Sequence, residues 1–472
     1  MPFKTKRALK VSDVMWEHKI LPVLYNYGLI PNVSPQFDPD WQKNGHMAAA
    51  VSLLVEWAEN QPIPGLSVKQ VQLPGLTPVI LMKIKGTAPG RTLIYGHCDK
   101  QPEMTGWRDG LSAWQPLRIG DEFYGRGLAD DGYSTFASLA APHLLIDQDI
   151  PYPDIVILIE ADEESGSKDL PAYIDFLAGE IGTPDLIICL DSGCGTYDQL
   201  WTTNSLRGVV NGNLKVEILK EGVHSGDASG VVPSSFRILR RLLDRMEDSF
   251  TGIIRPEQLY VDVPTDRMDE ARAVAVALGD AVWRKFPFVD GALPMNDDPL
   301  ELVLNRTWRP TLSYIGAKDI PCEDANMGNV LRPSSTLRLS TRTPPTLDAE
   351  AAGRVMKEIF EADPPYGARV TFVPDQIASG WNAPSLAPWL ASSVNHASEA
   401  AFGKPAMAWG EGGSIPFMKM LGDRYPDAQF LITGILGPGS NAHGANEFLH
   451  VPAVKQLTVC IAHVLADQAA MD

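Results

Sequence analysis

DIVILIEADEE, residues 154–164, is the stretch that decides the fold of this chain. Its run of branched apolar residues predicts a buried strand. Four acids follow the run: Glu160, Asp162, Glu163 and Glu164. Carboxylates gathered at the end of a buried strand are costly unless a cation compensates them, although an acidic first turn of a helix would also be favoured by the helix dipole. Because open α/β sheets bind ligands beyond the carboxyl ends of their strands, we expect a cation site here.

Two further apolar runs end in side chains that bind metals. RTLIYGHCD, residues 91–99, ends with His97 and Asp99, and DLIICLDSG, residues 185–193, contains Asp191. In an extended chain, residues two apart point to the same side, so Asp99 is placed to orient the imidazole of His97. Taken alone, the pair is equally well explained as a chance pairing in a surface turn.

Two glycine-rich loops supply the remaining candidates. YGRGLADDGYST, residues 124–135, contains Asp130 beside Asp131, and GPGSNAHGANE, residues 437–447, contains His443. Adjacent carboxylates in a tight loop repel each other unless a cation neutralises them. Taken singly, a solvated acidic loop and a polar loop histidine also explain these motifs.

Together these motifs form a chemically complete set. The five candidate metal ligands are His97, Asp130, Glu164, Asp191 and His443. Two imidazoles and three carboxylates suit a pair of Zn²⁺ or Mn²⁺ ions, with Asp130 shared between them. Glu163, next to the ligand Glu164, is then free to act as general base and general acid. The sequence therefore predicts a metal-dependent hydrolase.

The length of 472 residues predicts two domains, because it exceeds what one hydrophobic core supports. Residues 1–207 alternate apolar strands with helical stretches, which predicts a largely parallel sheet covered by helices. Residues 208–381 contain alternating strands and amphipathic helices, typical of an inserted α+β domain, with an irregular acidic stretch at about 250–310. Residues 382–472 return to long helices and one buried strand, and complete the first domain.

The composition argues against some classes of binding partner and favours one cellular location. The net charge of −18 argues against nucleic acid and anionic membranes as partners. Every apolar run falls short of the roughly 20 residues that cross a bilayer, and the start, MPFKTKRALKVSD, has no apolar core of a secretory signal. Five scattered cysteines favour a reducing, cytoplasmic location over a disulfide framework.

The motifs also follow a family-specific order. GHCDKQP, GRGLADDG, EADEESGS, LDSG, SLRG, GVHSG, EGGSIP and HGANE succeed one another between residues 96 and 447. In this order they resemble the co-catalytic dinuclear zinc metallopeptidases that include glutamate carboxypeptidase, aminoacylase, and carnosine and cytosolic nonspecific dipeptidases. The length and the long middle insert are most similar to the dipeptidase branch, and the resemblance covers essentially the whole chain.

The resemblance implies an α/β fold, with a zinc-peptidase-like catalytic domain and an inserted ferredoxin-like lid and dimerisation domain. The catalytic sheet would be mixed but mostly parallel, flanked by helices. Two divalent ions per subunit are implied, with Zn²⁺ preferred and Mn²⁺ or Co²⁺ as alternatives. By similarity one ion is held by His97, Asp130 and Asp191, and the other by Asp130, Glu164 and His443. Asp130 and Asp131 would be joined by a cis peptide bond.

Residues of the insert receive roles only through the resemblance. His224 of GVHSG would enter the partner's active site in a homodimer and stabilise the oxyanion. Arg342 of STRTPP and the backbone amides of Gly413, Ser414 and Ile415 would bind the substrate carboxylate. Asn329 would face the substrate at a position where dipeptidases usually have threonine. Without the resemblance, a solvated histidine, a surface arginine and an ordinary helix start explain these residues.

The function implied is hydrolysis of dipeptides that have a free C-terminal carboxylate, by metal-activated water with Glu163 as general base and Asp99 orienting His97. One alternative is an N-acyl amino acid deacylase or a carboxypeptidase of the same family, because its acid and metal set would be identical. A more distant alternative is a metal-bound binding protein without catalysis. No nucleic acid or membrane partner is expected.

Overall fold

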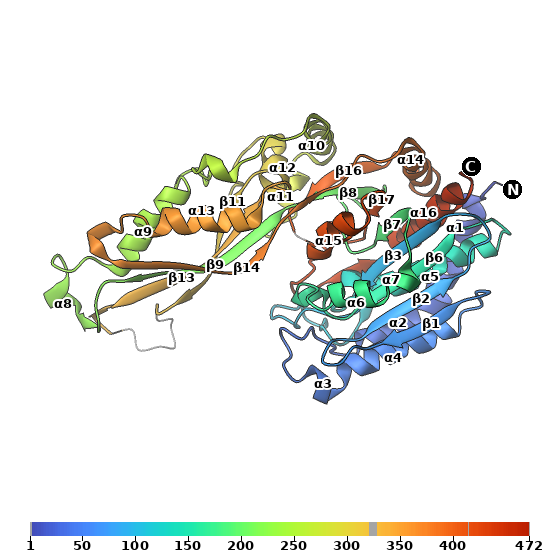
Figure 1. Cartoon of the computed structure of the whole chain (residues 1–472), viewed down its shortest axis with the longest axis horizontal. Coiled ribbons are helices and arrows are strands. Elements are labelled where there is room, and N and C mark those ends of the chain that lie inside the picture. Colours follow the sequence, from blue (N-terminus) through green and yellow to red (C-terminus); the bar gives the residue numbers. More distant parts are fainter. Residues whose placement is uncertain (1, 321–327, 414, 472) are drawn as a thin grey trace. The chain divides into compact units, whose positions relative to one another are not determined.

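The computed structural model describes residues 2–320, 328–413 and 415–471, and the chain forms two compact units (Figure 1). The first unit comprises Met1–Asn204, Ala383–Ala408 and Met420–Asp472, and the second comprises Ser205–Asn382 and Trp409–Lys419. Strands β8 (Trp201–Leu206) and β16 (Met407–Glu411) and helix α15 (Pro416–Arg424) cross the boundaries between the units.

A mixed sheet forms the centre of the first unit, in the order β1-β2-β6-β3-β7-β17-β8. Its strands besides β8 are β1 (Ser67–Val71), β2 (Val79–Ile84), β3 (Arg91–His97), β6 (Asp154–Glu160), β7 (Leu186–Cys189) and β17 (Gln429–Ile432). Strands β6, β3, β7 and β17 pair in parallel, and the outer pairs are antiparallel. The α/β fold class is thus confirmed, with parallel pairing at the centre of the sheet.

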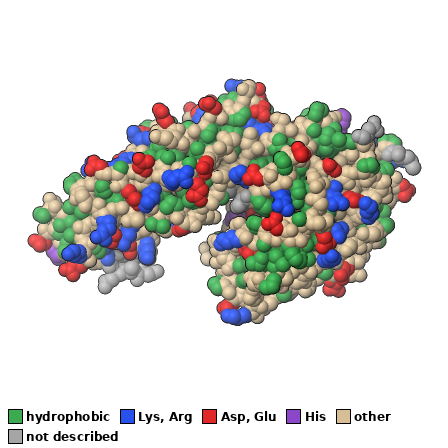
Figure 2. Space-filling view, in the orientation of Figure 1, with side chains coloured by type: hydrophobic (Ala, Val, Ile, Leu, Met, Phe, Trp, Pro, Cys, Tyr) green, Lys and Arg blue, Asp and Glu red, His purple; other side chains and the backbone are tan. Residues whose placement is uncertain are grey.

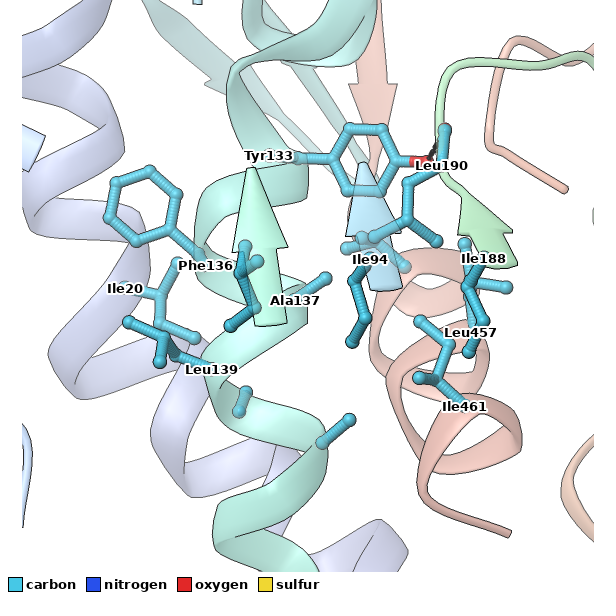
Figure 3. Packing of buried hydrophobic residues seen from close by; sticks show 14 of the residues in the cluster. Ile20, Ile94, Tyr133, Phe136, Ala137, Leu139, Ile188, Leu190, Leu457 and Ile461 are labelled. Atoms are coloured by element: carbon cyan, nitrogen blue, oxygen red, sulfur yellow. Dashed lines mark hydrogen bonds between the residues drawn. The ribbon is translucent and has the colours of Figure 1, made fainter. Parts of the chain in front are cut away.

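Helices cover this sheet on both faces. The helices of this unit are α1 (Thr5–Met15), α2 (Leu21–Gly28), α3 (Trp41–Asn44), α4 (His46–Glu59), α5 (Tyr133–Ile146), α6 (Leu170–Phe176), α7 (Ala178–Ile181), α14 (Pro388–Phe402) and α16 (Val451–Ala469). On one face, Ile94 of β3 and Ile188 of β7 lie in one buried cluster with Phe136 of α5 and Ile461 of α16 (Figure 3). Full burial of each such side chain contributes about 1.5–3 kcal/mol. On the other face, Glu180 of α7 forms ion pairs with lysines of β1 and β2.

A small antiparallel sheet completes the first unit in the order β18-β5-β4. Its strands are β4 (Leu117–Ile119), β5 (Glu122–Tyr124) and β18 (Phe448–His450). Because β5 leads into the loop of Asp130 and β18 follows the loop of His443, this pairing brings two distant segments of the chain together.

The second unit is built on an antiparallel sheet in the order β11-β13-β9-β14. Its strands are β9 (Gly208–Glu217), β11 (Thr311–Lys318), β13 (Ser334–Thr343) and β14 (Arg369–Ala378), and short strands are β10 (Val223–His224), β12 (Val330–Leu331) and β15 (Trp381–Asn382). Helices are α8 (Ser225–Ala228), α9 (Ser235–Met246), α10 (Thr265–Leu278), α11 (Ala281–Arg284), α12 (Pro299–Thr307) and α13 (Ala349–Glu361). Helices α9 and α13 share a buried cluster with the sheet. Numbered along the chain, the strands lie in the order 4-1-3-2, which confirms the ferredoxin-like topology.

The structure differs from the sequence analysis at two places. The stretch at about 250–310, predicted to be irregular, contains α10, α11 and α12. Apolar residues fill positions 273–278 of α10 without a gap, so its sequence lacks the helical spacing that would reveal it. Second, Trp409–Lys419 belongs to the second unit, although residues 382–472 were assigned to the first domain. Glu411 pairs with Arg306 at 3.0 Å, and Gly412 O accepts a hydrogen bond from Arg207, which ties this segment to the second unit.

Acidic and basic side chains are interspersed over both units on the face shown in Figure 2. Among the described residues, the helices are all too short or too polar to cross a membrane.

Candidate metal centre

Three of the predicted ligands follow neighbouring parallel strands of the first unit. His97 is the last residue of β3, Glu164 lies in a 3₁₀ turn (Glu163–Ser165) just after β6, and Asp191 lies two residues after β7. Because β6 and β7 both pair with β3 in parallel, these strand ends meet at one edge of the sheet. Gly96 permits a close approach there, since a Cβ atom would lie 2.2 Å from Ser134 Oγ at the start of α5.

The other two ligands come from loops. Asp130 lies in the turn Leu128–Gly132 that precedes α5, and the Asp130–Asp131 peptide bond is cis, as the resemblance predicts. His443 lies between β17 and β18 with a φ of 64°, in the left-handed region that few residues other than glycine adopt. These loops bring an imidazole and a carboxylate to the strand ends.

The five side chains converge into two groups that share Asp130. His97 Nε2 lies 3.3 Å from Asp130 Oδ1 and 3.9 Å from Asp191 Oδ2. His443 Nε2 lies 3.1 Å from Asp130 Oδ2 and 3.2 Å from Glu164 Oε2. Within each group one ligand atom per residue lies within 4.8 Å of the others. Each oxygen of Asp130 therefore faces a different group, as expected of a bridging ligand.

Neighbouring side chains hold the ligands in place. His97 Nδ1 lies 3.1 Å from the backbone O of Asp99 and 3.4 Å from its Oδ1. The same carboxylate accepts hydrogen bonds from the backbone amides of Glu163 at 3.1 Å and Glu164 at 3.0 Å. Gln101 Nε2 donates to Glu164 Oε2 at 2.6 Å. Asp99 thus links the ligand on β3 to the acidic turn after β6, beyond the role of orienting His97 that its position predicts.

The electrostatics of this cluster reflect an excess of buried carboxylates. Burial acts to raise the pKa of Asp130, but hydrogen bonds with His443 and His97 hold it below its usual range. Burial raises the pKa of Asp191 to about 7, with the charge of His97 opposing the shift. Burial and the charge of Asp191 raise the pKa of Glu163 well above its usual range. When these carboxyl groups are ionised, the protein's own cationic groups therefore do not balance the negative charge of the cluster.

The donor set fits divalent cations. Imidazole nitrogens and carboxylate oxygens are the ligands that Zn²⁺ accepts, and Mn²⁺ and Co²⁺ accept the same set. Glu164 Oε1 is buried and makes no hydrogen bond among the described residues, although its other oxygen is held by Gln101. A buried carboxylate oxygen without a donor costs free energy that a cation offsets. Two cations, one for each group, satisfy this chemistry.

In the second unit, Arg342 lies on β13 and is half-buried. Burial lowers the pKa of the neighbouring Arg207 to about 9, and the charges of Arg342 and Arg306 contribute to that shift. The backbone amide of Arg207 donates to Gly413 O at 3.1 Å, and Ile415 follows at the start of α15. Arg207, Arg306 and Arg342 thus place three guanidinium charges near one another in this unit. Ser414 lies outside the described residues.

His224 and Asn329 lie at the opposite end of the same unit. His224 is exposed on β10 and pairs with Val330 of β12, and the amide of Ser225 donates to Asn329 O at 2.9 Å. Asn329 precedes β13 at its Ser334 end, whereas Arg342 lies near the Thr343 end, at a separation of about 25 Å for eight strand residues. The unit therefore does not bring His224 and Asn329 beside Arg342.

Sequence reasoning missed three residues of the first unit that contact the metal-ligand loops: Gln101, Arg126 and Glu447. Each lies inside a motif that was recognised, in GHCDKQP, GRGLADDG and HGANE. An arginine and a glutamate about 320 residues apart could have been paired only by knowing that β5 and β18 are neighbours.

Comparison with known proteins agrees with this geometry. A sequence profile of the Peptidase family M20/M25/M40 matches residues 93–467. The chain belongs to this family of peptidases. It is 26% identical over 395 residues to a cysteinylglycine-S-conjugate dipeptidase of Corynebacterium striatum, covering 80% of this chain and 81% of that protein. The family predicted from the motif order is thereby confirmed.

Solved structures share the fold over the full length. The di-peptidase Dug1p of Saccharomyces cerevisiae superposes with a TM-score of 0.81 at 19% identity, and human carnosine dipeptidase 1 with 0.79 at 18%. In both comparisons 100% of this chain and 100% of the other chain are covered. At such identities the likeness concerns the fold.

Proposed function

We propose that this peptidase is a metal-dependent dipeptidase that cleaves dipeptides with a free C-terminal carboxylate. It would hold two divalent ions per subunit, one by His97, Asp130 and Asp191 and the other by Asp130, Glu164 and His443. The observation that carries the proposal is the pair of ligand groups that face opposite oxygens of Asp130, with Glu163 directly beside the ligand Glu164. Divalent ions bound in this way acidify a water molecule and polarise a substrate carbonyl.

Glu163 is the proposed general base and general acid. It is half-buried, and its backbone amide donates to Asp99, which holds the backbone at this position. Burial and Asp191 raise its pKa, which favours proton uptake, whereas the charge of bound cations would lower the pKa. In the reaction Glu163 takes the proton of the attacking water and passes it to the leaving amine. Asp99 keeps His97 in the tautomer that binds metal through Nε2.

Residues of the second unit are proposed to bind the substrate. Arg342, with its planar fork, and the amides of Gly413, Ser414 and Ile415 would bind the terminal carboxylate, and the neighbouring Arg207 adds positive charge. Asn329 would contact the substrate. His224 would serve the partner's site in a homodimer, where it stabilises the oxyanion. The exposure of His224 and its distance from Arg342 support a role outside its own carboxylate site.

Dipeptides are the proposed substrate class because the relatives are dipeptidases by name. A deacylase or a carboxypeptidase would use the same acid and metals on a different substrate. Turnover across dipeptides, tripeptides and N-acetyl amino acids, with Zn²⁺, Mn²⁺ or Co²⁺ supplied in turn, separates these activities. The native ion is taken as Zn²⁺, and the cytoplasmic location remains a prediction.

The decisive experiment replaces Glu163 by glutamine. Glu163→Gln keeps the size of the side chain but removes its ability to take a proton, so kcat should fall about 100- to 10,000-fold. Because Glu163 is not a proposed ligand, the metal content per chain should stay at two ions. Glu56→Gln, which changes an exposed carboxylate on α4, is the matched control and should leave kcat and metal content unchanged.

Two results would contradict the proposal in different ways. Glu163→Gln with more than about a tenth of the parent kcat would remove Glu163 from the mechanism. A parent protein that binds two ions but cleaves no member of the substrate panel would refute the dipeptidase proposal and leave a metal-bound protein without this activity.

A further inference from the structure

A fully buried ion pair lies behind the metal-ligand loops of the first unit. Arg126 Nη1 donates to Glu447 Oε2 at 2.6 Å, and the side chains are 1% and 0% exposed. Neither residue is among the five metal ligands. An ion pair taken wholly out of water is weak evidence for added stability, since its desolvation cost offsets its attraction. The role of this ion pair is therefore sought in the hydrogen bonds that its two side chains make.

Glu447 binds the backbone around Asp130. Its Oε1 accepts hydrogen bonds from the amide of Gly127 at 3.0 Å and from the amides of Ala129 and Asp130 at 3.3 Å each. Three amides converging on one carboxylate oxygen form an anion-binding concavity. The carboxylate of Glu447 thus holds the turn that presents both oxygens of Asp130.

Arg126 binds the two other ligand loops. Its Nη2 donates to Gly444 O at 2.5 Å, directly after His443, and its Nε donates to Pro102 O at 3.0 Å, in the segment that follows His97. The planar guanidinium has donors on three sides, so a single side chain reaches both carbonyls and the carboxylate of Glu447. Loops that are far apart in the sequence are joined through this one group.

We propose that Arg126 and Glu447 are positioning residues that set the affinity of the dinuclear site by holding Asp130 and His443 in the geometry that binds metal. His443 adopts a left-handed backbone conformation, and Asp130 must face both imidazoles, so neither loop has a regular helix or strand to fix it. Strand ends position His97, Glu164 and Asp191. The buried pair positions the two ligands that lie in loops, Asp130 and His443. The inference rests on the proposed metal binding and adds to it the source of its geometry.

The test is a metal titration of the stripped, full-length protein. Glu447→Gln keeps the shape of the side chain but removes the charge that faces Arg126, and Arg126→Lys keeps a buried charge but cannot reach all three acceptors. In each variant at least one of the two Zn²⁺ ions should bind about 10- to 100-fold more weakly, as loss of groups that support metal ligands usually causes. With excess metal, kcat should fall while KM changes little, and the absorption spectrum of the Co²⁺-loaded protein should shift.

Glu17→Gln is the matched control, because Glu17 pairs with Arg118 at 2.6 Å on the surface of the same unit without contacting any ligand loop. It should bind both ions as the parent does. If Glu447→Gln does not fold, Arg126→Lys decides the question alone, since it retains the ion pair.

The proposal is overturned if the variants have a lower Tm but bind both ions within twofold of the parent, because the pair would then be only structural. A parent that binds no pair of ions would instead refute the proposed function. The two failures are therefore distinguishable in one titration series.

Discussion

Replacing Asp99 by asparagine tests how the acidic turn after β6 is held. In the parent, each oxygen of the Asp99 carboxylate accepts one backbone amide, that of Glu163 at 3.1 Å and that of Glu164 at 3.0 Å. Asparagine has the same shape but only one acceptor oxygen. One amide of the turn would therefore face the NH₂ group of the new side chain, in a region where Asp99 itself is fully buried.

The magnitude follows from these two bonds. Hydrogen bonds to a charged group contribute about 1.5–3 kcal/mol each, and a buried amide without an acceptor costs a similar amount. Asp99→Asn should thus lower the free energy of unfolding by about 2–3 kcal/mol, and Asp99→Ala, which removes both acceptors, by about 3–6 kcal/mol. Since Asp99 also supports His97, metal affinity should fall 10- to 100-fold, which corresponds to about 1.4–2.8 kcal/mol.

Denaturant unfolding of the metal-free protein measures the first effect, and Zn²⁺ titration measures the second. Asp348 offers a matched control, because it caps α13 in the second unit by accepting the amides of Glu350 and Ala351. Asp348→Asn should cost some stability without any change in metal affinity. The proposed coupling between Asp99 and the metal centre is refuted by either of two results. Asp99→Ala could have the same denaturant midpoint of unfolding as the parent, or it could bind Zn²⁺ as tightly as the parent.

Two further predictions concern other parts of the chain. Arg342→Met should raise KM at least tenfold for a dipeptide with a free carboxylate while changing kcat less, because a bidentate contact in the ground state is lost. An equal rise in KM for a C-terminally amidated peptide would exclude carboxylate binding as the role of Arg342. For Glu17, the hydrogen bond with Arg118 lowers the pKa to about 2, with burial opposing the shift. The folded-state pKa lies below the unfolded one, so the carboxylate stabilises the protein above about pH 4.5, and this contribution is lost as the pH falls through about 2. After allowance for solvent screening, Glu17→Gln should cost about 1 kcal/mol at pH 7, and thermal unfolding should show the difference shrinking as the pH is lowered toward 3.

The strand ends could be predicted from the sequence because two independent signals agreed there. Apolar runs such as residues 154–160 form buried strands, and a polar side chain directly after such a run has few structural explanations. The central strands and the ligands His97, Glu164 and Asp191 were found in this way, whereas Asp130 and His443 were found in glycine-rich loops and the division into two groups came from the resemblance. Helix α10 was not predicted because its apolar residues run consecutively over 273–278 instead of recurring at helical spacing, and β11 was not predicted because most of its residues are exposed.

The supporting contacts could not be predicted from the sequence because they depend on side-chain directions across distant segments. Nothing in the spacing of Arg126 and Glu447 indicates that they form a buried pair, and Gln101 could equally face solvent. The roles of His224 and Arg342 came from the resemblance alone. The structure adds that they lie at opposite ends of the second unit, which no pattern of residues would reveal.

The spacing of the strands fits the division of the candidate ligands into two groups with one shared member. Neighbouring strands lie about 4.8 Å apart, so β6 and β7, on opposite sides of β3, are separated by about 10 Å. Ligand atoms of one Zn²⁺ ion, each about 2 Å from the metal, cannot lie much more than about 4 Å apart. The carboxylates of Glu164 and Asp191, which follow these two strands, are therefore suited to different ions. A ligand that reaches both must come from outside the three strands, and Asp130, presented by a loop and facing an imidazole with each oxygen, meets that requirement.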